Sequence, residues 1–338
     1  MEKQLVVGVS PSIRDRVSVE TIMWAVVIAL IPSLAISLYF FRLRALLLIV
    51  VSSLTAIAME ALFQRVTHRK MTVRDGSALI TGILLAYNLP PGAPFWVPIV
   101  GSGFAIIIAK QLFGGLGYNF INPALAGRAF LMASWPEIMT HRWMPTATGV
   151  LSGIDAMTSA TPLSTLSEAN RILADPLSTM EQLQNANLAI SQLSSHSSLI
   201  NLLWGNVGGC IGETSAIMLL VGASYLLLKR YIDWRIPLSY VGTVALLAWA
   251  VPSGATPLFH LLSGGLMLGA FYMATDPVTS PITLRGRWIF GFACGVITFV
   301  IRRWGGYPEG VSYSILLMNC ATPLVDKLTR PKRYGEAK

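Results

Sequence analysis

The sequence predicts an all-α membrane protein that crosses the bilayer many times. Of its 338 residues, 54% are hydrophobic and only 12% are charged, and the mean hydropathy is +0.61. Soluble domains carry about 25% charged residues. Long apolar runs recur along most of the chain, and a spanning helix needs about 20 mostly apolar residues. These observations favour a polytopic membrane protein over a soluble domain.

The apolar runs predict about ten transmembrane helices, five on each side of a long polar segment. The predicted spans lie near residues 20–41, 44–63, 76–90, 94–112 and 121–135, and then near 211–229, 236–252, 257–274, 286–302 and 311–328. Several are short or interrupted by Gly and Pro, so they barely reach across a hydrocarbon core of about 30 Å. The N-terminal stretch "MEKQLVVGVSPSIRDR" carries charges where a signal peptide needs an apolar region, so no cleavable signal is predicted.

The distribution of positive charge predicts the topology. Cytoplasmic loops of membrane proteins are enriched in Lys and Arg, and both termini are expected in the cytoplasm on this basis. The cationic residues then inside are Lys3, Arg14, Arg16, Arg65, Arg69, Lys70, Arg74, Lys110, Lys229, Arg230, Arg235, Arg285, Arg287, Lys327, Arg330, Lys332, Arg333 and Lys338. Those outside are Arg42, Arg44, Arg142, Arg171, Arg302 and Arg303. The net charge of +9 therefore indicates orientation in a membrane, and no nucleic-acid partner is expected.

The two halves resemble each other weakly. "TGILLAYNLPP" (81–91) aligns with "LGAFYMATDPV" (268–278), matching Gly82 to Gly269 and Pro90 to Pro277. Because each half holds five spans, the second repeat would be inverted in the membrane relative to the first, as in urea-transporter-like folds and other transporters. The predicted units are a first repeat at 1–135, an extracytoplasmic loop at 136–205 and a second repeat at 206–338.

The loop contains "DAMTSATPLSTL", residues 155–166. One interpretation is a helix start, with Thr161 as N-cap, Pro162 first in the helix, and Leu163, Leu166 and Leu173 along one face. A second is an attachment site. Asp155 stands six residues before Thr161, Ser159 and Ala160 leave room for a bulky group, and Pro162 holds Thr161 extended so that its hydroxyl is presented. The two are compatible, since a phosphate at an N-cap faces free helix N–H groups.

The stretch matches D-x-x-[S/T]-[G/S]-A-T, the acceptor motif to which a flavin transferase attaches FMN through a threonine phosphoester. With "GGLGYNFINPALAGRAF" (114–130) and "FYMATDPVTSP" (271–281), it makes the whole chain resemble the D subunits of Rnf complexes, which are ion-translocating ferredoxin:NAD oxidoreductases. The chain is similar, more distantly, to the B subunits of sodium-translocating NADH:quinone reductases. Ser159 stands where the D subunits are expected to have Gly, a departure that the broader motif allows.

The resemblance implies a function in electron transport. Thr161 would carry FMN as a phosphoester, making the chain a flavoprotein and a phosphoprotein, and Asp155 would help to engage the donor nucleotide and its metal. The implied partners are membrane and peripheral subunits with iron–sulfur clusters and flavins, the flavin transferase, and the lipid bilayer. A second, non-covalent flavin, riboflavin, is a further implication. The chain would be an electron-carrying subunit of a translocase that moves Na⁺ or H⁺, rather than a catalyst by itself.

Two other function classes remain open at the level of sequence: a solute channel or secondary transporter of inverted-repeat fold, and a structural anchor for redox partners. A plain channel has no need of the motif at residues 155–161. "GSGFAII" lacks the strand–turn–helix context of a nucleotide-binding fingerprint, so NAD and ferredoxin are assigned to partner subunits.

Ionisable and broken-helix residues within the spans are the remaining candidates. Arg128 either neutralises a flavin anion or phosphate or pairs with an intramembrane acid. Asp276 either binds a cation or caps the turn before Pro277. Lys110 is expected to extend to the cytoplasmic face, and Glu60 and Glu213 are expected at the interface. Asn122 and Pro123 are expected to help form a flavin pocket.

The cysteine and histidine patterns predict no metal site. Cys210, Cys294 and Cys320 are scattered, and the four histidines are dispersed. Free cysteines are usually small apolar core residues, which is the favoured interpretation; a cluster shared with a partner chain is the alternative.

Overall fold

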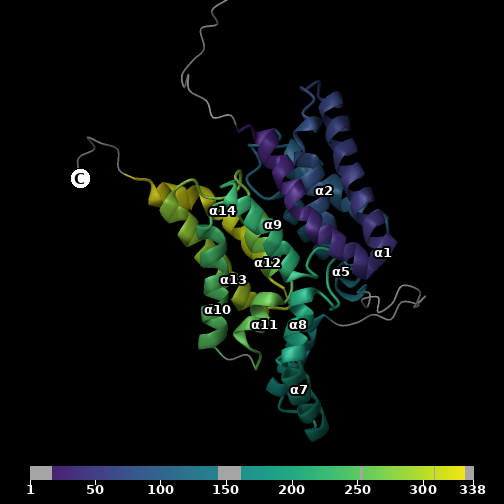
Figure 1. Cartoon of the computed structure of the whole chain (residues 1–338), viewed down its shortest axis with the longest axis vertical. Coiled ribbons are helices and arrows are strands. Elements are labelled where there is room, and N and C mark those ends of the chain that lie inside the picture. The colour runs from purple at the N-terminus through teal and green to yellow at the C-terminus, as the bar shows by residue number, and fades with distance from the viewer. Residues whose placement is uncertain (1–16, 144–160, 252–253, 308, 332–338) are drawn as a thin grey trace, which may run out of the picture.

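The structure is a computed structural model that describes residues 17–143, 161–251, 254–307 and 309–331 (Figure 1). In these residues all regular secondary structure is helical, which confirms the predicted all-α class. The first half contains α1 (Val19–Val66), η1 (Val73–Asp75), α2 (Ser77–Tyr87), α3 (Trp96–Phe104), the π-helical turn η2 (Ala105–Gln111), α4 (Pro123–Ser134) and α5 (Pro136–His141).

The middle segment contains α6 (Pro162–Ala174), α7 (Met180–Leu193) and α8 (His196–Trp204). The second half contains α9 (Ala216–Leu228), α10 (Arg235–Ala250), α11 (Pro257–Leu262), α12 (Leu266–Leu268), the π-helical turn η3 (Gly269–Met273), α13 (Leu284–Trp304) and α14 (Val311–Thr329). Every predicted span overlaps one of these helices or a broken run of two or three of them. The spans at 20–41 and 44–63 both fall on α1, which is interrupted at Arg42 (φ 55°, ψ −147°).

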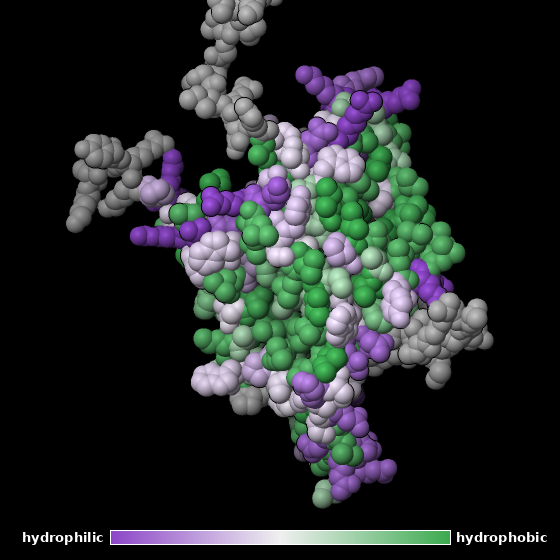
Figure 2. Space-filling view, in the orientation of Figure 1, coloured by the Kyte–Doolittle hydropathy of each residue, from purple (hydrophilic) through white to green (hydrophobic). Residues whose placement is uncertain are grey.

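Within the described residues, α1 and α13 are long and apolar enough to cross a membrane. The helices α2, α9 and α10, and the continuous run of α3 and η2, are shorter but apolar. Figure 2 shows hydrophobic side chains over most of the visible face of the bundle, and hydrophilic ones at its upper end and on the projecting α7. This surface is typical of a protein embedded in lipid between two polar ends.

The N-terminal helix α1 joins the two halves. It packs against α2 of the first half and α9 of the second. The approach to α9 is close because Gly222 has no side chain: a Cβ atom there would lie 1.8 Å from the carbonyl oxygen of Ala29. The Tyr272 hydroxyl donates to the carbonyls of Ala29 (3.2 Å) and Leu219 (2.9 Å), so η3 is fixed to the same contact.

The helices α6, α7 and α8 form an arm at one end of the bundle, with α7 furthest from it (Figure 1). Each begins at a hydroxyl side chain that accepts a hydrogen bond from the first turn: Thr161, Thr179 and Ser195. Such caps satisfy N–H groups that have no partner within the helix. The polar sequence of 136–205 therefore encodes short capped helices, and Thr161 stands where the first of them meets the bundle.

Candidate functional site

Thr161 is the N-cap of α6, and the predicted helix start is confirmed. Its backbone is extended (φ −74°, ψ 151°), and its Oγ1 accepts a hydrogen bond from the Ser164 N–H at 3.2 Å. Leu163 and Leu166 are buried as expected, whereas Leu173 is 38% exposed. The expectation of a solvent-presented hydroxyl was wrong, because only 8% of Thr161 is exposed. The side chain faces cavities instead, since α6 lies against the bundle.

A cavity of about 700 Å³ lies beside Thr161. Its walls come from α4, α5, α6 and the chain around the start of α14, and they include Arg128, His141, Trp143, Thr161, Ser164, Ser167, Glu168, Arg171, Tyr307, Glu309 and Tyr313. Ligand pockets in proteins have volumes of about 300–1,000 Å³. The cavity is therefore large enough for a nucleotide cofactor.

The donors and rings in this cavity match the parts of a flavin nucleotide. Tyr307 and Tyr313 lie with ring centroids 5.5 Å apart, and Trp143 faces the same cavity. Aromatic faces suit a planar ring system, while the Arg171 guanidinium and the Ser164 hydroxyl suit a phosphate. The residues present thus fit FMN attached at Thr161. Of the other predicted acceptor residues, Asp155, Ser159 and Ala160 lie outside the described residues.

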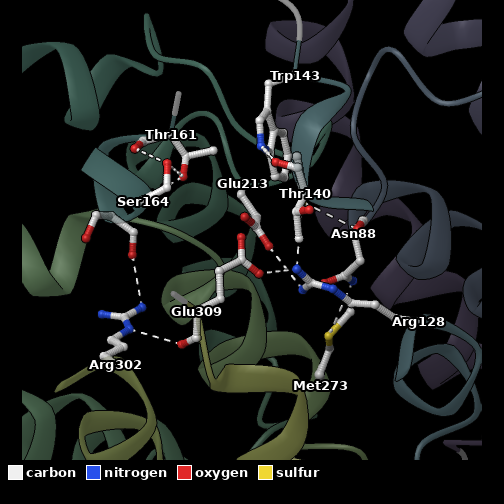
Figure 3. A network of polar contacts seen from close by, with 12 residues as sticks. Asn88, Arg128, Thr140, Trp143, Thr161, Ser164, Glu213, Met273, Arg302 and Glu309 are labelled. Atoms are coloured by element: carbon white, nitrogen blue, oxygen red, sulfur yellow. Dashed lines mark hydrogen bonds and ion pairs between the residues drawn. The ribbon is translucent and has the colours of Figure 1, made fainter. Parts of the chain in front are cut away.

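Arg128 lies in a buried ionic cluster at the wall of this cavity (Figure 3). One guanidinium nitrogen lies 2.6 Å from Asn88 Oδ1 and 3.4 Å from Glu213 Oε1, and the other contacts Glu309. Arg128 is 3% and Glu213 7% exposed. Arg128 is thus paired with acids, as one interpretation expected, and it also lines the large cavity; Glu213 is buried within the protein rather than exposed at its surface. The chain after α8 folds back into the bundle, where the Ile211 and Gly212 N–H groups donate to the carbonyls of Leu89 and Tyr87.

Sequence reasoning missed Glu309. It stands in "GGYPEGVS", which has the composition of a turn between two spans. In the structure its carboxylate points to Arg128 rather than to solvent (Figure 3). The sequence contains one signal, an acid directly before Gly310. In the structure Gly310 is the N-cap of α14 and has a left-handed conformation (φ 70°).

A second buried ionic cluster surrounds Lys110. Its Nζ lies 2.9 and 3.0 Å from the two Glu60 oxygens and 2.6 Å from the Ser77 hydroxyl. The side chains of Lys110 and Glu60 are each only 1% exposed. The predictions that Lys110 extends to the cytoplasmic face and that Glu60 is interfacial were therefore wrong. In the π-helical η2, successive residues are rotated less than in an α-helix, so Gln111 also reaches Glu60, at 2.7 Å.

Asn122 and Pro123 begin α4, with Asn122 as a side-chain N-cap. They line a separate cavity of about 70 Å³, together with Lys110 and Asp276, and not the cavity beside Thr161. Its volume is below that of ligand pockets, and the flavin pocket expected at Asn122 and Pro123 stays a prediction. Asp276 accepts hydrogen bonds from the Val278 N–H (3.2 Å) and the Thr279 hydroxyl (3.3 Å), which agrees with its turn-capping interpretation.

The cysteines are free in the structure. Cys210 and Cys294 are buried, in agreement with the core interpretation, whereas Cys320 is exposed. Cys210 Sγ lies with the carboxylate oxygens of Glu213 and Glu309, all within 4.8 Å of one another.

Comparison with known proteins gives a match along nearly the whole chain. Residues 6–335 match the NQR2, RnfD, RnfE family. The chain is 47% identical to the D subunit of the Na(+)-translocating ferredoxin:NAD(+) oxidoreductase complex of Acetobacterium woodii, over 100% of this chain and 97% of the relative. It is 43% identical to the D subunit of the proton-translocating ferredoxin:NAD(+) oxidoreductase complex of Clostridium ljungdahlii, over 96% and 95% of the two chains. Identity to the D subunit of the ion-translocating oxidoreductase complex of Stutzerimonas stutzeri is 42%, over 95% and 93%.

Proposed function

The chain belongs to the NQR2, RnfD, RnfE family, and we propose that it carries FMN on Thr161 and relays electrons within an ion-translocating ferredoxin:NAD oxidoreductase complex of the Rnf type. Its relatives are named as subunits of such oxidoreductase complexes. The observation that carries the proposal is the position of Thr161: the acceptor threonine of the motif opens onto a cavity of about 700 Å³.

The described residues suggest how the cofactor would be held. Thr161 would form the phosphoester at the N-terminus of α6, where the positive end of the helix dipole and the Ser164 hydroxyl stabilise phosphate charge. Arg171, further along α6, lines the same cavity. Trp143, Tyr307 and Tyr313 would contact the ring. When bound, FMN supplies the electron-transfer chemistry, and the protein fixes its position and surroundings.

The acceptor residues before Thr161 would act during maturation. Asp155 would help a flavin transferase to engage the donor nucleotide and its metal, since a carboxylate stabilises phosphates only with a cation between them. Ser159 and Ala160 would leave room for the transferred group. The other partners of the proposal are membrane and peripheral subunits that bear iron–sulfur clusters and flavins.

The proposed topology has ten spans in two inverted repeats, with both termini in the cytoplasm and residues 136–205 outside a prokaryotic cell membrane. The cationic residues support it through the positive-inside tendency. The start of α1 and the end of α14 lie toward one end of the bundle, and α7 projects from the other (Figure 1). FMN on Thr161 would then stand at the extracytoplasmic side.

In-gel flavin fluorescence tests the attachment. The chain is coexpressed with its partner subunits and a flavin transferase of verified activity, and denatured bands are compared for the wild type, Thr161→Ala and Thr165→Ala. Thr165 is a matched control, since it lies one turn along the same helix and its hydroxyl bonds the Thr161 carbonyl at 3.1 Å. Fluorescence is expected in the wild type and in Thr165→Ala only. A dark wild-type band would refute the redox function in favour of a cofactor-free channel, and fluorescent Thr161→Ala would move the attachment to another residue.

Labelling of introduced cysteines in intact cells tests the topology. In a Cys320→Ser background, which removes the exposed native thiol, an impermeant maleimide should react with Leu177→Cys and not with Lys70→Cys. Both positions are exposed in the structure. The reverse pattern would place the Thr161 cavity in the cytoplasm and overturn the proposed orientation.

A further inference from the structure

The cluster around Arg128 contains more carboxylate than its contacts compensate. Glu213 and Glu309 both contact the single guanidinium of Arg128. Arg302 is a second buried cation nearby and adds positive charge, but its nitrogens donate to the backbone carbonyls of His260 (2.6 Å), Ser263 (3.1 Å) and Glu309 (3.1 Å) rather than to either carboxylate. Two carboxylates that share one cation at close range do not both remain ionised easily, because like charges repel strongly away from water. The geometry favours one proton held between Glu213 and Glu309.

A small cavity beside the two carboxylates provides an independent observation. Its volume is about 20 Å³, and its lining includes Thr161, Glu213, Thr214, Gly264 and Glu309. The Thr214 hydroxyl is buried, and among the described residues it has no hydrogen-bond partner. A cavity of this size holds one water molecule when polar groups line it. An unpartnered hydroxyl beside two carboxylates therefore indicates a site for a water that carries protons to and from the pair.

The same residues separate this small cavity from the large one. Glu309 and Thr161 line both cavities, and Arg128 lines the large cavity. A negative charge added in the large cavity would thus lie in a space that one carboxylate of the pair, Glu309, itself lines. The interaction of two nearby charges in a protein interior can change the proton-binding equilibrium of a carboxylate by about tenfold or more.

We propose that Glu213 and Glu309 form a proton-exchange site that takes up one proton when FMN on Thr161 accepts one electron. The inference rests on the proposed function. The electron comes from a one-electron centre of a partner subunit, an iron–sulfur cluster or a flavin. It would add one negative charge to the ring, and one proton from bulk water would bind the carboxylate of the pair that is still ionised, so the pair would go from one bound proton to two and the charge of the ring and pair together would be unchanged. When the electron leaves, the proton returns to water.

Other ionisable groups lie near the carboxylate pair or line the large cavity. A test must therefore distinguish proton uptake by the pair from titration of these groups. They are Arg128 on α4, His141 on α5, Glu168 and Arg171 on α6, Cys210 before α9, Arg302 on α13, Tyr307 before α14 and Tyr313 on α14. Most of these are not carboxylates, so an infrared band of a protonated carboxyl group distinguishes the pair from them. Glu168 is also a carboxylate. It is distinguished because a band from Glu168 would persist when Glu213 or Glu309 is replaced by Gln.

The experiment uses the purified, flavinylated complex. In-gel fluorescence first establishes that the wild type, Glu213→Gln, Glu309→Gln and the control Glu137→Gln all carry flavin, which tests folding and the proposed function separately. Glu137 is a matched control because it is an exposed acid on α5 and does not line the cavity. The midpoint potential of this flavin is then titrated between pH 6 and 9.

In the wild type and Glu137→Gln, the reduction equilibrium should change tenfold per pH unit over part of this range, and the change should be lost in Glu213→Gln and Glu309→Gln. Infrared difference spectra of the wild type should show a carboxylic acid C=O band on reduction that shifts in D₂O, which needs no variant. Equal pH dependence in all four proteins, or no such band in the wild type, would overturn the proton-exchange site. A potential that follows Na⁺ concentration at fixed pH instead would replace the proton by an alkali cation and also overturn it. No flavin on the wild type would refute the proposed function itself.

Discussion

The cluster around Lys110 and the cluster around Arg128 are both buried, yet they balance their charges differently. Lys110 has one carboxylate partner, Glu60, and its third donor bonds the Ser77 hydroxyl. Glu60 in turn accepts from the side-chain amides of Gln64 (3.2 Å) and Gln111 (2.7 Å). Every donor of the ammonium has an acceptor, and the pair is neutral.

In the Arg128 cluster two carboxylates contact one guanidinium, the nearby Arg302 hydrogen-bonds neither carboxylate, and residues of the cluster line two cavities. In the Lys110 cluster the charges balance and every donor of the ammonium is hydrogen-bonded, which disfavours proton exchange. The contacts of this cluster instead hold α1, α2 and η2 together. An unbalanced cluster beside a water-sized cavity responds to any charge that arrives nearby. The comparison indicates that stoichiometry, and not burial, separates a structural ion pair from an exchange site.

The largest expected effect is on the balanced pair. Lys110→Met leaves Glu60 buried without a cation, which typically costs about 3–5 kcal/mol. The measurement is thermal unfolding of the detergent-solubilised chain, compared with Lys70→Met, an exposed lysine. The double variant Lys110→Met/Glu60→Gln should recover most of the loss, because no charge then remains buried. A single-variant cost below about 1 kcal/mol would show that the pair is hydrated.

Arg128→Met should cost less and depend on pH. It leaves Glu213 and Glu309 without their cation, but protonation of the two carboxylates relieves the repulsion, and the cost falls to that of unmade hydrogen bonds, about 1–3 kcal/mol. Because uptake of protons stabilises the folded variant, the loss should be smallest at low pH and grow as the pH rises. Unfolding scans at pH 5 and pH 8 measure this. A loss that is the same at both values would contradict the excess of carboxylate.

Glu309→Gln should change stability by less than about 1 kcal/mol, in contrast to Glu60→Gln. Arg128 keeps Glu213 as an ionised partner and Asn88 as an acceptor, and a glutamine oxygen can still accept from the guanidinium. Glu60→Gln instead leaves Lys110 buried and unpaired, at about 3–5 kcal/mol. Parallel unfolding scans of the two variants compare the clusters directly. Equal losses would mean that both carboxylates are needed to balance Arg128.

The sequence predicted what depends on local pattern. The helices follow from apolar runs, and the α6 start at Thr161 follows from a hydroxyl residue before Pro162, both of which are short-range signals. The orientation of Lys110 and Glu60 could not be predicted in the same way. They are far apart in the sequence, and their contact depends on the packing of α1 against the π-helical turn η2, for which the sequence offers no recognised signature.

The same limit applies to the Arg128 cluster. Arg128 was recognised as a charge within a span, but its partners Glu213 and Glu309 lie at the start of one predicted span and in the turn before another. Both segments fold back into the bundle, and only tertiary contacts such as the backbone hydrogen bonds from Ile211 and Gly212 bring them there. A charge within a membrane predicts that a partner exists, and not which one.

The smallest expected effect concerns an ion pair outside both clusters. Asp233, between α9 and α10, contacts Arg235 at 2.9 Å and Arg287 at 2.5 Å. Partial burial raises the pKa of Asp233, but the hydrogen bonds from these residues outweigh it and leave the pKa below its ordinary value. A lowered pKa gives stability that is present above the pKa of the unfolded chain, about 3.9, and is lost as the pH falls through the folded value. Asp233→Asn should therefore cost about 0.2–1 kcal/mol at pH 7 and less near pH 3. Unfolding scans at the two pH values, with and without added salt, test this, because a partly exposed pair should weaken in salt whereas the Lys110–Glu60 pair should not. If the loss of stability caused by Asp233→Asn stayed the same in high salt, the Asp233 ion pair would behave like the buried Lys110–Glu60 pair and not like an exposed one.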